Sequence, residues 1–286
     1  MLAMSAVSVV VLTMGDRPEE LAAAIGSARA QTGVDVEIVL VVNGGDPNRT
    51  LADIVVEPGE NLGIPAGRNA GAAVGSGPLI CFLDDDGRLH REVLASAATA
   101  FVSDPRLGVI GLRIVDEAGE TARRHVPGLR RRPDRSAGAT SFPGGACIVR
   151  RAPFDGLAGL CGEFRYGLEE TDLAWRVIDA GWNIVYRADL YMTHPRTVPT
   201  RHPDFHRRTA RNRVWLAHRL LPLPLAVLYV ANWTLVTAVR NIGNPSALAA
   251  HAAGTLDGLR NRLGPRAPMK WSSIIRLVRL GRPPVI

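Results

Sequence analysis

The sequence predicts an α/β fold: a mostly parallel β-sheet flanked by helices and followed by a C-terminal helical extension. Two observations lead to this prediction. Short, continuous apolar runs alternate with helix-length segments through the first half of the chain. From about residue 201 the sequence becomes first strongly basic and then apolar. Continuous apolar strands separated by helices are typical of parallel sheets that are covered on both faces.

The first two strands and the helix between them are the clearest elements. The run Val7–Leu12 predicts the first buried strand, and Val36–Val42 predicts the second. Between them, Pro18 suits the first turn of a helix, and two glutamates follow it near the positive end of the helix dipole. Leu21 and Ile25 lie on one face of this helix, four residues apart, so that face is expected to be buried.

Polar clusters follow three of the predicted strands. Ile54–Val56 and Leu79–Leu83 predict the third and fourth strands, with a helix rich in small residues over Gly67–Val74 between them. Ligands of open α/β sheets bind beyond the carboxyl ends of the strands. The sequence therefore predicts a nucleotide and metal site at that edge of the sheet. The three clusters are Thr13–Asp16, Asn43–Asp46 and Asp84–Asp86.

The second half of the chain has a less regular pattern. The stretch Arg123–Arg135, rich in arginine and proline, predicts a loop, and Phe142–Val149 predicts a loop that feeds another strand. Gly167–Val177 opens with acids and continues as an amphipathic helix, and Gly181 suits the left-handed position beyond its end. The chain then returns as a strand at Ile184–Tyr186.

The composition narrows the class of protein. The 286 residues are 47% hydrophobic and 21% charged, so the chain can bury a substantial core. We expect a sheet unit over residues 1–200 and a helical unit over 201–286. The net charge of +7 favours phosphate-bearing partners. Three cysteines without CxxC spacing and an N-terminus without a basic signal region both indicate a cytoplasmic protein.

The C-terminal unit combines basic and apolar segments. Arg201–Arg213 is a basic run, and Leu220–Val239 contains no charged residue and meets the length of a membrane span. Prolines stand at the start of the apolar segment and polar residues interrupt it, so an interfacial helix pair fits as well. The sequence leaves two interpretations open: peripheral contact with the inner face of a membrane through residues 201–240, or a helical cap with a solvated basic rim.

Three consecutive carboxylates form the candidate metal site. Asp84, Asp85 and Asp86 follow an apolar strand, and clustered carboxylates are ligands that Mg²⁺ and Mn²⁺ prefer. On an extended chain Asp84 and Asp86 point to one side and Asp85 to the other. An isolated run of three acids is as often a solvated turn, so the surrounding motifs decide.

Six segments, spread over residues 7–196, share their order with a known protein family. In these segments the chain resembles the inverting glycosyltransferases of family 2 with the GT-A fold, especially the rhamnosyltransferase-like members. The resemblance implies a GT-A unit that uses Mg²⁺ or Mn²⁺ and a nucleotide-diphosphate sugar. The segments are Val7–Thr13, Glu37–Gly44, Asn61–Asn69, Phe82–Gly87, Gly144–Arg150 and Tyr166–Arg176.

The resemblance also implies residues that bind the donor and the metal. Asp84 would contact the ribose or base region, Arg68 would approach the donor, and Asp86 would bind the metal that bridges the two phosphates. The family often has an aspartate where this chain has Val42, so the contact to the base falls to Asn43, Asp46 or backbone. The donor-binding residues implied in this way are Thr13, Gly15, Asn43, Arg68, Asp84 and Asp85.

The segment Glu169–Asp172 matches the acidic motif of the family. Inverting transfer needs a base that removes the proton of the acceptor hydroxyl. The match places Glu170 where the family usually has its catalytic aspartate. Asp172 is the second candidate, although acids near a helix start are favourable without any catalysis. The resemblance further implies that His194 completes the metal shell, although a lone histidine is more often structural.

The sequence thus predicts transfer of a hexose or deoxyhexose, with inversion, to a lipid-linked or small polar hydroxyl acceptor. A metal-dependent nucleotidyltransferase is a second candidate, but it would need a phosphate loop for which Thr13–Arg17 is too sparse. A basic nucleic-acid-binding module is a third. It would need basic and aromatic residues on one face, whereas only 5% of the residues are aromatic, so we expect no nucleic acid partner.

Overall fold

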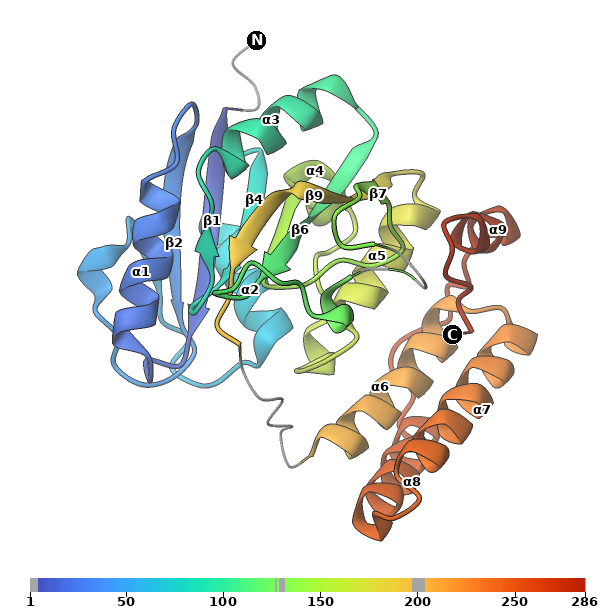
Figure 1. The fold of residues 1–286 in the computed structure, drawn as a ribbon. Coiled ribbons are helices and arrows are strands. Elements are labelled where there is room, and N and C mark those ends of the chain that lie inside the picture. Colours follow the sequence, from blue (N-terminus) through green and yellow to red (C-terminus); the bar gives the residue numbers. More distant parts are fainter. Residues whose placement is uncertain (1–4, 127, 129–131, 197–203, 286) are drawn as a thin grey trace.

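A single mixed β-sheet forms the centre of the protein (Figure 1). The structure, a computed structural model, describes residues 5–126, 128, 132–196 and 204–285. The strands lie in the order β3-β2-β1-β4-β8-β6-β9-β5, and β7 pairs with β9 beside this path. Their bounds are β1 Ala6–Thr13, β2 Asp35–Val42, β3 Ile54–Val56, β4 Leu79–Asp84, β5 Arg88–Leu89, β6 Leu107–Val115, β7 Ala137–Gly138, β8 Ala146–Arg150 and β9 Asn183–Thr193.

The strands of the N-terminal half are parallel, as predicted. β1 pairs in parallel with both β2 and β4, and β2 pairs in parallel with β3, so the carboxyl ends of these strands meet at one edge. β8 runs antiparallel between β4 and β6, and β9 runs parallel to β6. Because β8 is antiparallel to both of its neighbours, β6 runs in the same direction as β4. The strands β6 and β9 therefore end at the same edge as β1 and β4. This edge is where the predicted site residues gather.

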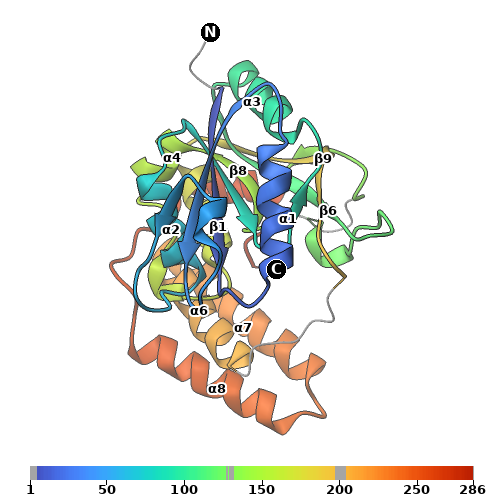
Figure 2. The same cartoon turned by 90° about the vertical axis from the view of Figure 1, so that its left-hand side faces the viewer.

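Helices cover both faces of the sheet (Figures 1 and 2). Side chains alternate along β1, so that Val9 and Val11 pack in one apolar cluster with α1 and α3, while Val10 packs in the other with α2, α4 and α5. Both faces are therefore closed to solvent. The bounds of these helices are α1 Pro18–Arg29, α2 Ile64–Val74, α3 Val93–Ser103, α4 Arg151–Gly156 and α5 Glu169–Asp179, with 3₁₀ turns at Arg49–Leu51, Arg123–His125 and Gly162–Phe164.

The predicted elements of the sheet unit agree with the structure to different degrees. The first four strands are confirmed to within one residue at each end. α2 begins at Ile64, before the predicted start at Gly67, because Pro65 occupies its first turn. Gly181 has the left-handed φ of +92° that was expected just beyond the helix α5. The sequence did not predict β6 or α3.

Helices α6, α7 and α8 lie beyond the edge of the sheet at which β1, β4 and β9 end, as both ribbon views show (Figures 1 and 2). Helix α9 lies elsewhere, where its Arg276 bonds to Asn183 at the start of β9. Prolines 222 and 224 stand at the N-cap and in the first turn of α7, so they begin this helix rather than break it. α7 passes the length and composition test for a membrane span, and only 17% of it is buried. The helices are α6 Phe205–Leu220, α7 Leu223–Arg240, α8 Pro245–Arg260 and α9 Trp271–Arg279.

Candidate active site

A large open cleft lies at the carboxyl ends of β1, β2 and β4. Its main part has a volume of about 930 Å³, within the range of small-molecule sites in proteins. α2 forms one wall, and the start of α6 reaches its rim through Phe205 and Arg208. The predicted residues that line this part of the cleft are Thr13, Asn43, Arg68, Asp84, Asp85, Asp86 and His194.

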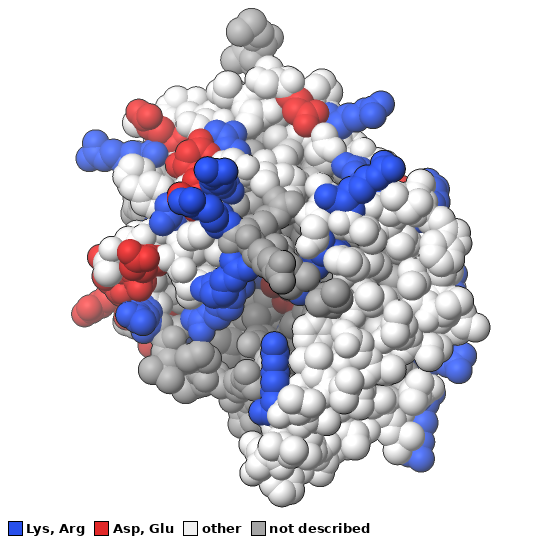
Figure 3. Space-filling model, turned by 45° about the vertical axis from the view of Figure 1, so that its right-hand side comes forward, with Lys and Arg blue, Asp and Glu red and all other residues white. Residues whose placement is uncertain are grey.

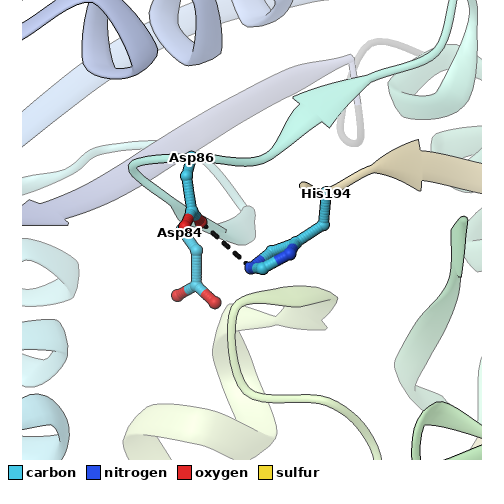
Figure 4. Close-up of side chains that lie close together, drawn as sticks. All are labelled: Asp84, Asp86 and His194. Atoms are coloured by element: carbon cyan, nitrogen blue, oxygen red, sulfur yellow. Dashed lines mark ion pairs between the residues drawn. The ribbon is translucent and has the colours of Figure 1, made fainter. Parts of the chain in front are cut away.

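Two carboxylates and one imidazole form a cluster in this cleft (Figure 4). Asp84 and Asp86 come from the end of β4, His194 follows β9, and one ligand atom from each lies within 4.8 Å of the others. The Nε2 atom of His194 is 3.1 Å from a carboxylate oxygen of Asp86, and its Nδ1 atom is 2.8 Å from the Pro195 carbonyl. Two carboxylates and an imidazole are a chemically suitable ligand set for a divalent cation.

The charges of the cluster influence one another. The hydrogen bond with Asp86 raises the pKa of His194. Burial alone would raise the pKa of Asp86, but the hydrogen bond with His194 and the charge of Arg17 bring that pKa below its usual value. Asp86 is therefore ionised at neutral pH, the form that a cation requires.

Asp85 also lines the cleft, but it is not part of this cluster and contacts the turn after β1 instead. Thr13 donates a hydrogen bond from Oγ1 to Asp85, over 2.7 Å, and the Thr13 hydroxyl accepts one from the Gly15 backbone over 3.0 Å. Burial raises the pKa of Asp85. Through Thr13, Asp85 thus orders the turn after β1.

Arg17 is a cleft residue that the sequence did not single out. Its guanidinium forms an ion pair with Asp86 and lies 3.6 Å from Asp85. The side chain remains 45% exposed and lines the cleft beside Asp86. The sequence gave no reason to single out Arg17, because an arginine just before a helix is usually an ordinary surface residue.

Arg68 and a pair of glycines bring two sets of acids together. Arg68, on α2, pairs with Asp84 over 2.7 Å and is almost fully buried. A Cβ atom on Gly145 would overlap the Asp84 carboxylate, and one on Gly144 would overlap Glu170 and Arg68. The glycine pair is therefore a steric requirement of the site. The sequence contained both glycines in a matched segment but gave no reason for them.

Glu170 faces an adjoining part of the same cleft. The cavity that contains Glu170 shares Arg68, Asp84 and His194 with the part that contains Asp86. Burial raises the pKa of Glu170, and the charge of Arg68 opposes this effect. The candidate base from the start of α5 and the candidate metal ligands from the end of β4 thus share one cleft.

Glu169 is the buried neighbour of Glu170. Its Oε2 atom has no hydrogen-bond partner among the described residues, and burial together with the charge of Glu170 raises its pKa to about 8. Because each of these adjacent carboxyls raises the cost of ionising the other, their titrations depend on one another. The sequence indicated an acidic helix start but not this burial.

The structure places Asp172 outside the cleft. It is fully buried and lies 2.6 Å from Arg176 and 3.2 Å from Arg219, so it connects α5 with α6. Asn43 lines the cleft but is also structural: its side chain accepts a hydrogen bond from the Leu62 backbone over 2.9 Å and donates one to Asn61 over 3.1 Å.

The family model "Glycosyl transferase family 2" matches residues 8–158, which include β1 to β4, the three aspartates and the glycine pair. The chain belongs to glycosyl transferase family 2. This family 2 chain is 29% identical over 121 residues to the glucosyl-dolichyl phosphate glucuronosyltransferase of Haloferax volcanii. The match covers 39% of this chain and 39% of that relative, so the chain spans well under two thirds of the relative's length.

Solved structures confirm the GT-A type fold that the resemblance implied. GalNAc-T7, solved with UDP, GalNAc and Mn²⁺, superposes with a TM-score of 0.66 at 13% identity, covering 90% of this chain and 56% of that one. The mannosyltransferase PcManGT from Pyrobaculum calidifontis, solved with GDP-Man and Mn²⁺, superposes with a TM-score of 0.56 at 18% identity, covering 96% and 78%. At these identities the likeness shows the fold alone.

Proposed function

We propose that this family 2 protein transfers a sugar from a nucleoside-diphosphate donor to an acceptor hydroxyl, with inversion at the anomeric carbon. The observation that supports the proposal is the shared cleft of Asp86 and Glu170, whose two parts have Arg68, Asp84 and His194 in common. The sugar is a hexose or deoxyhexose, with a rhamnosyl donor as one candidate.

The donor side of the reaction belongs to the strand ends. Asp86 and His194, with Asp84 in reach, would hold a divalent cation, Mg²⁺ or Mn²⁺. When bound, such a cation supplies charge neutralisation to the departing nucleoside diphosphate. The turn from Thr13 to Gly15, held by Asp85, and the side chain of Asn43 line the nucleotide pocket. Arg17 and Arg68 add positive charge beside it.

The acceptor side belongs to the start of α5. Glu170 takes the proton from the acceptor hydroxyl as the oxygen attacks the anomeric carbon from the face opposite the leaving group. Its raised pKa brings it toward neutral pH, where a general base works best. Arg68 holds Asp84 and lies against Glu170, so it positions both sides at once. Asp172 has a structural role, because its ion pair with Arg219 connects α5 with α6.

Donor binding and product stereochemistry test this proposal. Asp86→Ala should abolish Mn²⁺-dependent binding of UDP-, GDP- or dTDP-sugars by calorimetry, while Asp134→Asn, at an exposed ion pair on a distant loop, should leave it unchanged. Proton NMR of the glycosylated product should show the anomeric configuration opposite to that of the donor. A product with the same anomeric configuration as the donor, or donor binding by Asp86→Ala equal to that of wild type, would contradict the proposal.

We further propose that the protein works on the surface of an anionic membrane, on a lipid-linked acceptor. Residues 201–286 contain 14 of the 34 Lys and Arg but 2 of the 27 Asp and Glu, a net charge of +12, so residues 1–200 carry −5 of the total of +7. Such an asymmetry favours contact between the C-terminal unit and anionic lipid headgroups. On this proposal the protein works at the inner face of the membrane and has no nucleic acid partner.

An exposed apolar stripe on α7 supplies the other half of this surface. Val227, Leu235 and Val239 are 62–65% exposed and lie on one side of the helix, and Ile242, just beyond it, is 86% exposed. Figure 3 shows the face over the C-terminal helices as largely uncharged, with basic side chains at its edge. Apolar side chains framed by arginines are typical of helices that lie in a membrane interface.

Vesicle flotation tests the membrane contact. The protein should float with vesicles that contain anionic lipid, less at high salt, and hardly at all with purely zwitterionic vesicles. The variant Val227→Asp with Leu235→Asp should stay in solution. Val102→Asp, at a 59% exposed valine on α3 of the sheet unit, is the matched control and should float. Flotation that is unaffected by the double variant would rule out this face.

A further inference from the structure

A small pocket lies between α5, α6, α7 and the C-terminal tail, behind the catalytic cleft. It has a volume of about 80 Å³, several times the space that one water molecule needs. A group as small as a phosphate can therefore enter it. Arg213 from α6, Tyr229 and Trp233 from α7, and Arg282 from the tail line it, with Thr171 from α5. We call it the Arg213 pocket. The proposed transfer reaction gives it no role.

Arg213 is a largely buried cation without an anionic partner in the described part of the chain. Its guanidinium stacks on the Trp233 ring at 3.9 Å from the ring centre and bonds to the neutral Tyr229 hydroxyl. No carboxylate of the described residues forms an ion pair with it, and the nearby charges of Arg240 and Arg282 repel it. Burial lowers its pKa. A buried charge without a counter-ion is costly for the fold, so an anion would stabilise this arrangement.

Two buried donors also lack acceptors. The Nε–H group of Arg213 and the Nε1–H group of Trp233 are buried and have no hydrogen-bond partner among the described residues. Both side chains line the pocket. Water could satisfy these donors but not the charge, whereas a phosphate oxygen satisfies both. Donors and charge together therefore favour a phosphate group.

The position of the pocket connects it with the acceptor side of the cleft. Ser141 and Arg282 line both the Arg213 pocket and the part of the cleft that contains Glu170. Thr171 directly follows Glu170 on α5. On the outer side of α7 lies the exposed apolar stripe that includes Val227 and Leu235. A phosphate in the pocket would thus lie between the proposed base and the proposed membrane surface.

We propose that the Arg213 pocket binds a phosphate group of the acceptor and so selects acceptors that carry one. This inference rests on the proposed sugar transfer, because it assigns the pocket to the acceptor of that reaction. The phosphate belongs either to a lipid-linked acceptor or to a soluble sugar phosphate. Both sources present the same oxygens to Arg213, Arg282 and Trp233.

Phosphate binding to the full-length, metal-free protein tests this inference. EDTA removes metal-dependent binding in the donor cleft, and the probes are inorganic phosphate, a soluble sugar phosphate and short-chain phosphatidic acid, followed by calorimetry and by tryptophan fluorescence. We expect Arg213→Gln to weaken binding of each probe at least tenfold. Arg213→Lys should recover part of the affinity. Arg211→Gln, on the same helix but stacked on Trp215 outside the pocket, is the matched control and should bind like wild type.

A second variant and a second readout separate this inference from the proposed reaction. Trp233→Phe removes the indole N–H but keeps a smaller aromatic ring on which Arg213 can stack, so it should weaken phosphate binding severalfold even if Arg213→Gln fails to fold. Mn²⁺-dependent donor binding should stay unchanged in every variant. Wild-type phosphate affinity in both Arg213→Gln and Trp233→Phe would overturn the inference while leaving the proposed function intact.

The same titrations distinguish the two sources of the phosphate. Binding of phosphatidic acid at least tenfold tighter than that of the sugar phosphate supports the pocket with a lipid-linked acceptor. Equal binding of the two supports it with a soluble one. Failure of all three probes to bind wild type would overturn the assignment of the pocket to phosphate.

Discussion

The sheet unit and the C-terminal helices organise charge in opposite ways. At the strand ends, carboxylates are concentrated and each is held by a specific partner, as Asp84 is by Arg68 and Asp85 by Thr13. In the C-terminal unit, arginines outnumber acids and Arg213 is buried without a carboxylate among the described residues. The first pattern suits a divalent cation and its phosphates, and the second suits an anionic partner. On the proposed function, sugar transfer and acceptor selection would thus occupy different parts of the chain.

A large effect on activity is expected at the glycine pair of the sheet unit. Gly145→Ala places a methyl group on the Asp84 carboxylate, and displacement of positioned groups typically lowers rates by about 10²-fold or more. We expect a loss of that size in kcat/KM together with weaker donor binding, while flotation with anionic vesicles is unchanged. Gly26→Ala, on α1 where a Cβ meets nothing within 4 Å, is the control. Full activity of Gly145→Ala would mean that the glycine is dispensable.

The next effect concerns the connection between the two regions. Asp172→Asn removes one charge of a buried ion-pair network, and such a loss destabilises proteins by about 3 kcal/mol. Urea unfolding should show this decrease, whereas the exposed Asp134→Asn should not. If Asp172 instead acts as the base, activity would fall by orders of magnitude with little change in the free energy of unfolding.

A smaller effect concerns the pH dependence of stability. The pKa of Glu169 is about 8 in the folded protein against an ordinary value of 4.5, so the folded state binds the proton more tightly than the unfolded state does. Stability should therefore decrease as the pH rises from about 4.5 to 8. Unfolding free energies measured across this window should fall less steeply for Glu169→Gln than for wild type. Parallel curves would show that Glu169 does not titrate there.

The smallest effect concerns Arg17. Arg17→Gln leaves Asp86 and His194 in place but removes a guanidinium from the proposed diphosphate position, so donor affinity should fall about tenfold, or about 1.4 kcal/mol. Arg29→Gln, on the same helix with a side chain that is also 45% exposed and ion-paired, should bind the donor normally. Equal donor affinity of Arg17→Gln and wild type would exclude this contact.

Local patterns in the sequence predicted the first half of the sheet well. Continuous β-branched runs gave β1 to β4. β6 was missed because Gly108, Gly111 and Arg113 interrupt its apolar run, and a strand of this kind depends on its partners β8 and β9. The antiparallel insertion of β8 likewise follows from pairing between distant segments.

The residues of the candidate site likewise fall into those that the sequence indicated and those that only the structure revealed. Residues in contiguous motifs, such as Asp86 and Glu170, could be singled out from the sequence. The burial of Asp172 against Arg219, the steric role of Gly145 and the unpaired donors of Arg213 and Trp233 depend on contacts between segments that are well separated in the sequence. One-dimensional spacing contains no information about such contacts, so the structure was needed to find them.

The Glu170→Gln variant tests most directly whether the strand ends and the start of α5 serve one reaction. Donor affinity and kcat are measured on the same preparation with Mn²⁺ present. We expect donor affinity within threefold of wild type and a kcat lowered by about 10²- to 10⁴-fold, as for loss of a general base. A kcat near that of wild type would contradict the assignment of Glu170 and the shared use of the cleft.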